Sequence, residues 1–433
     1  MMGKKVMIQF LASAMSGGLA LLILALSARL FGPEILGQVA YFIGILGLIF
    51  TFSDLGLSRS HVHFTAARGG QPELTTFLAI KLPLLLVAGL AATAWSIWQR
   101  LPGEFLVLLL VEIFYRLADS ILISFEGQER AWPQNLLKLA VKIIRLLAVI
   151  IFGWKMASVI GYALSFLIEA AVIFLGALIM SRRWWSVLPT REALKRYLIY
   201  SWPFAAIIPL SYLQENSLVL MLKYWQGNAA LGIYVAGFGL FGFIKSFSSS
   251  LMTYFFPRIS QLNQVKDQAS IQRYTDMAVK FSIWIMAPLV LILLIFSQWL
   301  VPLVLGNQFI PAINVFRIYL LGILLLAIFN PYDHVLFATN NHRSIVRINF
   351  LTTLLLLILG WQLVPVWGGA GAAWTNVIIW LIGGFWQFRV MNQKTGIRFL
   401  RDWRLSKVEV KYLYGLIHSF GQAVFRFSGK KTG

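Results

Sequence analysis

The chain has 433 residues, of which 59% are hydrophobic, only 12% are charged and none is cysteine. Soluble globular domains carry about 25% charged residues, disordered chains are poor in apolar residues and disulfide scaffolds are rich in cysteine, so all three classes are excluded. The apolar residues suffice for roughly a dozen membrane-spanning helices of about 20 residues each, which indicates a polytopic membrane protein.

Hydropathy predicts an all-α membrane protein with about twelve transmembrane helices. The first apolar run continues to Phe31 without a clear cleavage site, so we interpret it as a span and not as a signal peptide. Short connections join the spans, and a basic tail at 392–433 is predicted to be cytoplasmic or to lie at the membrane interface. The predicted spans are 8–31, 35–57, 75–98, 104–125, 136–154, 157–180, 198–222, 229–256, 277–302, 312–338, 345–366 and 370–391.

The distribution of positive charge predicts the orientation. Lys and Arg number 37 against 16 Asp and Glu, which gives a formal net charge of +21. One side of the bilayer collects nearly all Lys and Arg outside the spans, whereas the other side has only Arg100, Lys155 and Lys223. Because cytoplasmic loops are enriched in Lys and Arg, we expect both termini in the cytoplasm. This topology accounts for most of the charge, so nucleic acid is not an expected partner.

The chain contains an internal repeat. Residues 32–53 match residues 227–248 at a constant offset of 195, with eight identities in 22 positions, four of them glycine pairs. An even number of predicted crossings separates the two copies, so both run in the same direction, which predicts a pseudo-two-fold axis along the membrane normal. The predicted architecture is two six-helix lobes, 1–195 and 196–391. A need for close helix packing at both sets of glycines is the alternative explanation.

Catalytic and metal-binding motifs are absent from the sequence. It has no P-loop, no cysteine and no HExxH motif, and its five histidines are scattered. We therefore expect a transporter and not an enzyme, with no cofactor, no metal site and no catalytic residue.

Charged residues inside the predicted spans are the candidate binding residues. Each costs about 2.5–3.5 kcal/mol at the centre of a bilayer, so it should face the protein interior, water or a partner. Four basic residues lie near the cytoplasmic ends of their spans, where a long side chain can reach water, namely Lys81, Lys138, Lys280 and Arg347. The residues that cannot be explained in this way are Arg116, Lys142, Arg145, Lys245 and Arg317.

Two patterns favour different roles for these charges. In span 104–125, Glu112, Arg116 and Asp119 share one face of the helix and can pair with one another. Span 136–154 has a cationic stripe with no acid in the same helix, formed at helical spacing by Lys138, Lys142 and Arg145. Such a stripe indicates a face that lines water or an anionic partner.

Lys245 also has no acid in its span and lies among Ser246, Ser248, Ser249 and Ser250. Together with the stripe it favours a cavity that accepts anions, and phosphate is a natural ligand for Lys and Arg donors.

Three segments resemble the polysaccharide flippases of the Wzx type, within the superfamily of multidrug, oligosaccharidyl-lipid and polysaccharide exporters. They are Arg29–Glu34 followed by Gly37 and Ala40, then Phe52–Leu57, and Pro365–Ala373 before the last span. The resemblance covers about residues 1–391, and its motifs are chiefly glycine and turn positions.

This resemblance implies a function. Family members move an undecaprenyl-pyrophosphate-linked oligosaccharide from the cytoplasmic to the outer leaflet of the bacterial cytoplasmic membrane, by alternating access through a cationic central cavity. Matched by residue type and span, the substrate-binding residues would be Arg116, Lys142, Arg145, Lys245 and Arg317. A proton or sodium ion as coupling ion, and other glycan-assembly proteins as partners, are left open.

Three alternatives remain at this stage. A cation-coupled multidrug exporter of the same architecture would need an acid-lined pocket, for which Asp54, Asp119 and Glu215 are the best candidates. A membrane-embedded polysaccharide polymerase or ligase should have a long external loop, and none is predicted. A structural subunit of a glycan-synthesis complex has less reason to contain two equivalent halves.

Overall fold

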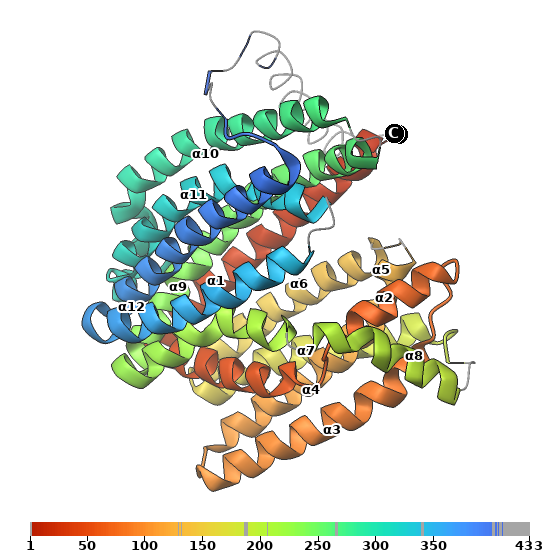
Figure 1. Cartoon of the computed structure of the whole chain (residues 1–433). Helices are drawn as coiled ribbons and strands as arrows, with labels where there is room; N and C mark the ends of the chain where they lie inside the picture. Colours follow the sequence, from red (N-terminus) through yellow and green to blue (C-terminus); the bar gives the residue numbers. More distant parts are fainter. Residues whose placement is uncertain are drawn as a thin grey trace, which may run out of the picture.

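The computed structural model consists of helices and their connections (Figure 1). The structure describes residues 2–128, 130, 132–185, 189–205, 207–264, 267–338, 342–400, 403, 404, 406 and 409, and these include no β-strand. The helices are α1 (Met2–Thr51), α2 (Leu57–Ala67), α3 (Leu74–Trp98), α4 (Gly103–Leu122), α5 (Ser124–Gly127), α6 (Trp132–Lys155), α7 (Val159–Ser181), α8 (Arg191–Ser201), η1 (Trp202–Phe204), α9 (Ile207–Gln264), α10 (Gln268–Leu305), η2 (Asn307–Phe309), α11 (Ala312–Ala338) and α12 (His342–Thr395).

The prediction of an all-α membrane protein is confirmed. Among the described residues, seven helices contain segments long and apolar enough to cross a membrane, namely α1, α3, α7, α9, α10, α11 and α12. Because α1, α9 and α12 each contain two predicted spans, these seven helices account for ten of the twelve. The remaining two predicted spans correspond to α4 and α6, which contain the charged residues described above. The count of twelve crossings stays a prediction.

Three of the long helices bend at a glycine, where the sequence predicts the boundary between two spans. Gly32 in α1 has φ 76°, Gly227 in α9 has φ 83° and Gly368 in α12 has φ 53°. Positive φ is strained for a residue with a Cβ atom, so glycine is required at these bends. Gly32 and Gly227 are a pair in the repeat, and they share nearly the same backbone conformation, with ψ 173° and −175°.

The two copies of the repeat meet each other through their glycines. A Cβ atom on Gly37 would overlap the carbonyl oxygen of Asn228, and a Cβ atom on Gly232 would overlap the carbonyl oxygen of Pro33. Both contacts obey the offset of 195, so α1 and α9 cross at a point of pseudo-two-fold symmetry. The repeat and the close packing are therefore two aspects of one contact. The lobe boundaries stay a prediction.

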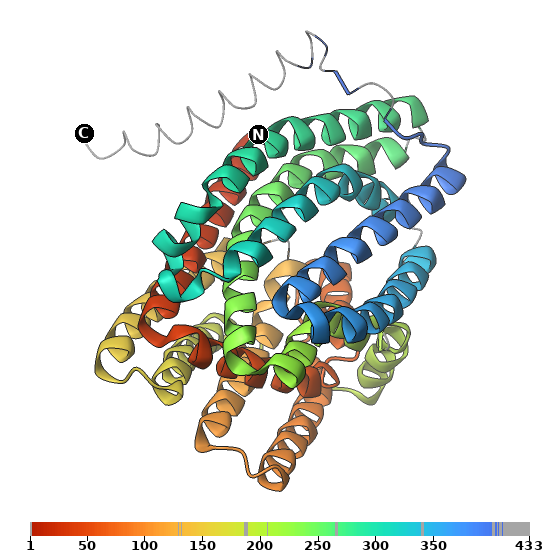
Figure 2. The same ribbon diagram turned by 90° about the vertical axis from the view of Figure 1, so that its left-hand side faces the viewer.

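The α1–α9 pair lies in the middle of the molecule. It forms the most extensive contact between two helices in the described residues. α3 lies at one edge and α10 at the opposite edge (Figures 1 and 2). Large apolar side chains such as Leu86 and Leu291 are exposed on these outer helices, as a surface that faces lipid requires.

Two lysines do not behave as the sequence predicts. We expected Lys81 and Lys280 to reach water at the cytoplasmic side, and this is wrong. Lys81 is only 3% exposed, and its Nζ lies 2.7 Å from Asp54 Oδ1. Lys280 is 8% exposed and pairs with Glu409 at 3.2 Å. Both carboxylates are far from their lysines in the sequence, so helical spacing within one span could not reveal these pairs.

The helix α8, between the two predicted lobes, docks on α2 and on the start of α3. Arg196 donates to Glu73 Oε2 at 2.7 Å, and the side chain of Tyr197 is fully buried. The hydroxyl of Tyr197 lies 3.1 Å from Nδ1 of His61, whose Nε2 lies 2.8 Å from Ser124 Oγ. A neutral His61 satisfies both contacts, because one ring nitrogen donates and the other accepts.

We expect acid to weaken this docking. Burial, and secondly the positive charge of Lys81, lowers the pKa of His61 to about 3. Because the ordinary pKa of about 6.5 returns on unfolding, the unfolded chain takes up a proton that the folded chain does not, and stability falls as the pH drops from 6.5 towards 3. The loss at pH 5 is roughly 2 kcal/mol.

The melting temperature of the purified protein at pH 7.5 and pH 5.0 measures this effect. His61→Asn should be less stable than the wild type at pH 7.5 but should lose less stability on acidification. An equal pH dependence in the two proteins would contradict the role assigned to His61.

Candidate functional site

A cavity of about 780 Å³ lies between α1, α6, α7 and α9. Its positive lining comes from Lys138, Lys142 and Arg145, which follow one face of α6. The repeat contributes glycines of α9, and the first half of α1 contributes small residues. Among the described residues, the lining is Ser16, Gly17, Ala20, Leu21, Ile23, Leu24, Asn135, Lys138, Lys142, Arg145, Tyr162, Glu169, Val235, Phe238, Gly239, Gly242, Phe243 and Ser246.

Two of the three cations have no carboxylate partner in the described part of the chain. Lys142 donates from Nζ to the carbonyl oxygen of Ser16 at 3.1 Å and to its Oγ at 2.5 Å. Lys138 forms no ion pair with any described residue. Because Ser16 is neutral, the positive charge of both ammonium groups is available to an anion in the cavity.

Arg145 differs from the two lysines. Its guanidinium lies 3.1 Å from Glu169 Oε2 and 3.6 Å from the centre of the Phe166 ring. The ion pair is imperfect, since Arg145 Nε and Glu169 Oε2 have no hydrogen-bond partner among the described residues. Three cations and one carboxylate leave two positive charges in the lining.

The other three residues predicted from the sequence do not line this cavity. Arg116 pairs with Glu112 at 2.7 Å on its own helix, α4, and Asp119 is exposed. Arg317 in α11 donates from Nε to Ser297 Oγ at 2.7 Å. Lys245 is exposed on α9, next to the lining residue Ser246, and the side chains of Ser248, Ser249 and Ser250 lie outside the described residues.

The sequence interpretation missed two members of the site. Glu169 lies inside the predicted span 157–180, so the search for charges within spans could have found it. Ser16 carries no such signal, because a serine in an apolar helix is common, and only the tertiary contact shows that it accepts from Lys142.

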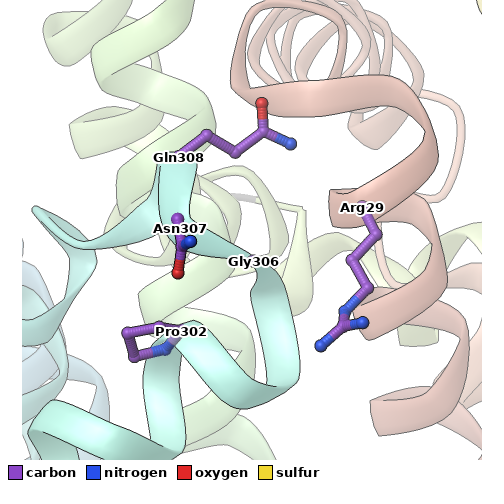
Figure 3. Close-up of a pocket in the computed structure, with 5 residues that line it drawn as sticks. All are labelled: Arg29, Pro302, Gly306, Asn307 and Gln308. Atoms are coloured by element: carbon purple, nitrogen blue, oxygen red, sulfur yellow. The ribbon is translucent and has the colours of Figure 1, made fainter.

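A second cavity, of about 470 Å³, lies beside the bend of α1 (Figure 3). Arg29 extends from α1 and donates to the carbonyl oxygens of Val304, at 3.1 Å, and Leu303. Gln308 Nε2 donates to the Ala28 carbonyl oxygen at 3.0 Å. The positive guanidinium therefore lies at the carboxyl end of α10, where the helix dipole favours it. These groups fasten α1 to α10 and η2, so this cavity is a weaker candidate for a ligand.

Two family models match this chain. A family model described as "Polysaccharide biosynthesis protein" matches residues 2–263, and the model MatE matches residues 203–362. The chain is 22% identical over 398 residues to the "Probable low-salt glycan biosynthesis flippase Agl15" of Haloferax volcanii, covering 90% of this chain and 83% of the relative.

Solved structures show the same fold. Lipid II flippase MurJ, in an inward closed conformation, matches with a TM-score of 0.68 and 16% identity over 97% of this chain and 99% of that one. An inward-facing multidrug resistance MATE family transporter of the MOP superfamily matches with a TM-score of 0.68 and 15% identity over 88% and 94%. At such identities the likeness establishes the architecture alone.

Proposed function

The chain belongs to the polysaccharide biosynthesis protein family, whose model matches more than half of its length, and from this premise we propose that it is a lipid-linked oligosaccharide flippase. The substrate is an undecaprenyl-pyrophosphate-linked oligosaccharide, which moves from the cytoplasmic to the outer leaflet of the bacterial cytoplasmic membrane. Both termini are cytoplasmic in this proposal, as the charge distribution predicts.

The observation that carries the proposal is the excess positive charge of the cavity. A diphosphate with attached sugars cannot cross about 30 Å of hydrocarbon unaided, because its charges and hydroxyls would lose their hydration. The ammonium groups of Lys138 and Lys142 can replace that hydration by charge-assisted hydrogen bonds. The guanidinium of Arg145 adds a third positive charge to the lining, which its pairing with Glu169 offsets.

In the proposed transport cycle, the cavity opens alternately to the two sides of the membrane. We propose that the lobes 1–195 and 196–391 rock against each other. The fastening of Arg29 to the end of α10 holds them together at the bend of α1, roughly 20 Å along the helix from Ser16. Arg116, Lys245 and Arg317 do not line the cavity in this conformation, and we assign them to the path that the head group follows in other steps.

A cation-coupled multidrug exporter is the second candidate, because the MatE model matches residues 203–362. The cavity argues against it. An exporter of cationic drugs needs an excess of acidic groups. Among the described lining residues, a single carboxylate, Glu169, faces three cations, and that carboxylate is itself paired.

Reconstituted protein can decide between the two. In proteoliposomes, we expect transfer of a fluorescently labelled undecaprenyl-pyrophosphate oligosaccharide between leaflets and no gradient-driven movement of the cationic dye ethidium. Empty vesicles and vesicles with heat-inactivated protein are the controls. Ethidium transport without lipid transfer would establish the exporter and refute the flippase.

A further inference from the structure

The register of the repeat extends beyond the segment in which the sequences match. A Cβ atom on Gly44 would lie 3.5 Å from Val219, and a Cβ atom on Gly239 would contact Leu24 at 2.6 Å. These two contacts are again related by the offset of 195, so the first half of α1 corresponds to the first half of α9. Neither helix bends in the two turns before Leu24 or before Val219, so the same offset holds for the residues in those turns.

The two symmetry-related contacts between α1 and α9 differ at one pair of positions. The offset relates Gly17 in α1 to Tyr212 in α9, and Gly242 to Gly47. Tyr212 donates from its hydroxyl to the Gly44 carbonyl oxygen at 2.8 Å, and its ring packs so tightly on Gly47 that a Cβ atom there would overlap it. At this contact the side chain of Tyr212 fills the gap between α1 and α9.

At the symmetry-related contact no tyrosine fills this gap. A Cβ atom on Gly17 would meet the side chains of Phe243 and Ser246, each at 3.3 Å, whereas a Cβ atom on Gly242 would meet no described atom within 4 Å. Both glycines line the cavity of about 780 Å³, next to Ser16 and the α6 cations. The cavity therefore lies where the pseudo-symmetry breaks down, because α1 has Gly17 at the position that corresponds to Tyr212 in α9.

We propose that Gly17 and Gly242 are specificity-determining residues, which make the cavity large enough for the sugars of the head group. This inference rests on the proposed function and assigns separate roles within the site. The ammonium groups of α6 bind the diphosphate by charge, and the two glycines admit the sugars by leaving space. A tyrosine at position 17 would extend from beside Phe243 and Ser246 into the cavity that Gly17 and Gly242 line, and would remove space without removing a charge.

The test is Gly17→Tyr, with two probes that differ only in the head group. Binding of undecaprenyl pyrophosphate and of undecaprenyl pyrophosphate carrying an oligosaccharide is measured on the purified protein in lipid nanodiscs. We expect the variant to bind the sugar-bearing lipid about tenfold or more weakly than the wild type, because a clash is the means of rejecting a larger ligand. Its affinity for undecaprenyl pyrophosphate should change by less than about threefold, which is under 1 kcal/mol.

Gly18→Tyr is the matched control, since a Cβ atom on Gly18 meets nothing within 4 Å and Gly18 does not line the cavity. It should bind both lipids as the wild type does. Gly242→Leu narrows the same cavity from α9 and replaces Gly17→Tyr if that variant does not fold.

Thiol labelling tests the geometry itself, because the chain has no cysteine of its own. Gly242→Cys should react with the anionic reagent methanethiosulfonate ethylsulfonate, and adding Gly17→Tyr should protect it. Equal labelling with and without the tyrosine would overturn the inference.

The binding outcomes separate the inference from the proposed function. If the wild type binds the sugar-bearing lipid and the folded Gly17→Tyr variant binds it equally well, only the inference is wrong. The inference is also wrong if the variant loses both lipids to the same extent, because that result would indicate a damaged diphosphate site. If the wild type binds neither lipid, the proposed function is wrong as well.

Discussion

Replacing Lys142 by glutamine is expected to lower the transfer of a lipid-linked diphosphate oligosaccharide about tenfold to a hundredfold, in a protein that still folds. The Lys142 ammonium group lines the cavity, and within the described part of the chain it donates only to the carbonyl and hydroxyl oxygens of Ser16. Glutamine keeps a donor for Ser16 but removes the positive charge that a diphosphate would bind. Hydrogen bonds to charged groups contribute about 1.5–3 kcal/mol, which corresponds to the expected range.

The rate of transfer in proteoliposomes measures this effect, with the amount of reconstituted protein held equal. Lys155→Gln is the matched control, because Lys155 is exposed at the end of the same helix. Lys142→Arg keeps the charge and should retain most of the transfer. A normal transfer rate in Lys142→Gln would show that this ammonium group does not bind the substrate.

Gly37→Ala is expected to be among the most destabilising additions of a single methyl group at the glycines of the described residues. A Cβ atom at position 37 would overlap the backbone carbonyl of Asn228, which cannot move aside as a flexible side chain can. α1 and α9 would have to separate along their whole contact. Overpacking of an interior typically costs 1–3 kcal/mol, and overlap with backbone places this variant at about 3 kcal/mol or more.

The melting temperature and the yield of monodisperse protein in detergent measure this loss. Gly232→Ala should be affected to a similar extent, since its Cβ atom would overlap the carbonyl of Pro33 at the symmetry-related contact. Gly18→Ala should change little, because nothing lies within 4 Å of its Cβ atom. Wild-type stability in both Gly37→Ala and Gly232→Ala would refute the close crossing of the two helices.

The features that the sequence predicts well are those that depend on local chemistry. Apolar length predicts the helices, and glycines at the predicted boundaries correspond to the bends at Gly32, Gly227 and Gly368. The internal repeat also indicates where α1 and α9 meet, because glycine is the residue that lets two backbones approach. These patterns can be recognised in the sequence without knowing which helix packs against which.

The pairing of charges could not be predicted in the same way. Helical spacing places Arg116 near Glu112, and the structure shows that pair. Spacing cannot show that Glu169 of α7 reaches Arg145 of α6, or that Asp54 reaches Lys81, because these contacts depend on how each helix is rotated against its neighbours. For the same reason the sequence grouped Arg317 with Lys142, although the structure leaves Arg317 bonded to Ser297 and outside the cavity lining.

We propose that Lys138 and Lys142 of α6, which form no ion pair with a described residue, bind the diphosphate of a lipid-linked glycan. Equilibrium binding of undecaprenyl pyrophosphate to the purified protein tests it most directly, with the wild type compared against the double variant Lys138→Gln and Lys142→Gln. We expect wild-type binding that weakens as the salt concentration rises, and an affinity about a hundredfold or more lower in the double variant. Equal affinity of the two proteins for this lipid would contradict it.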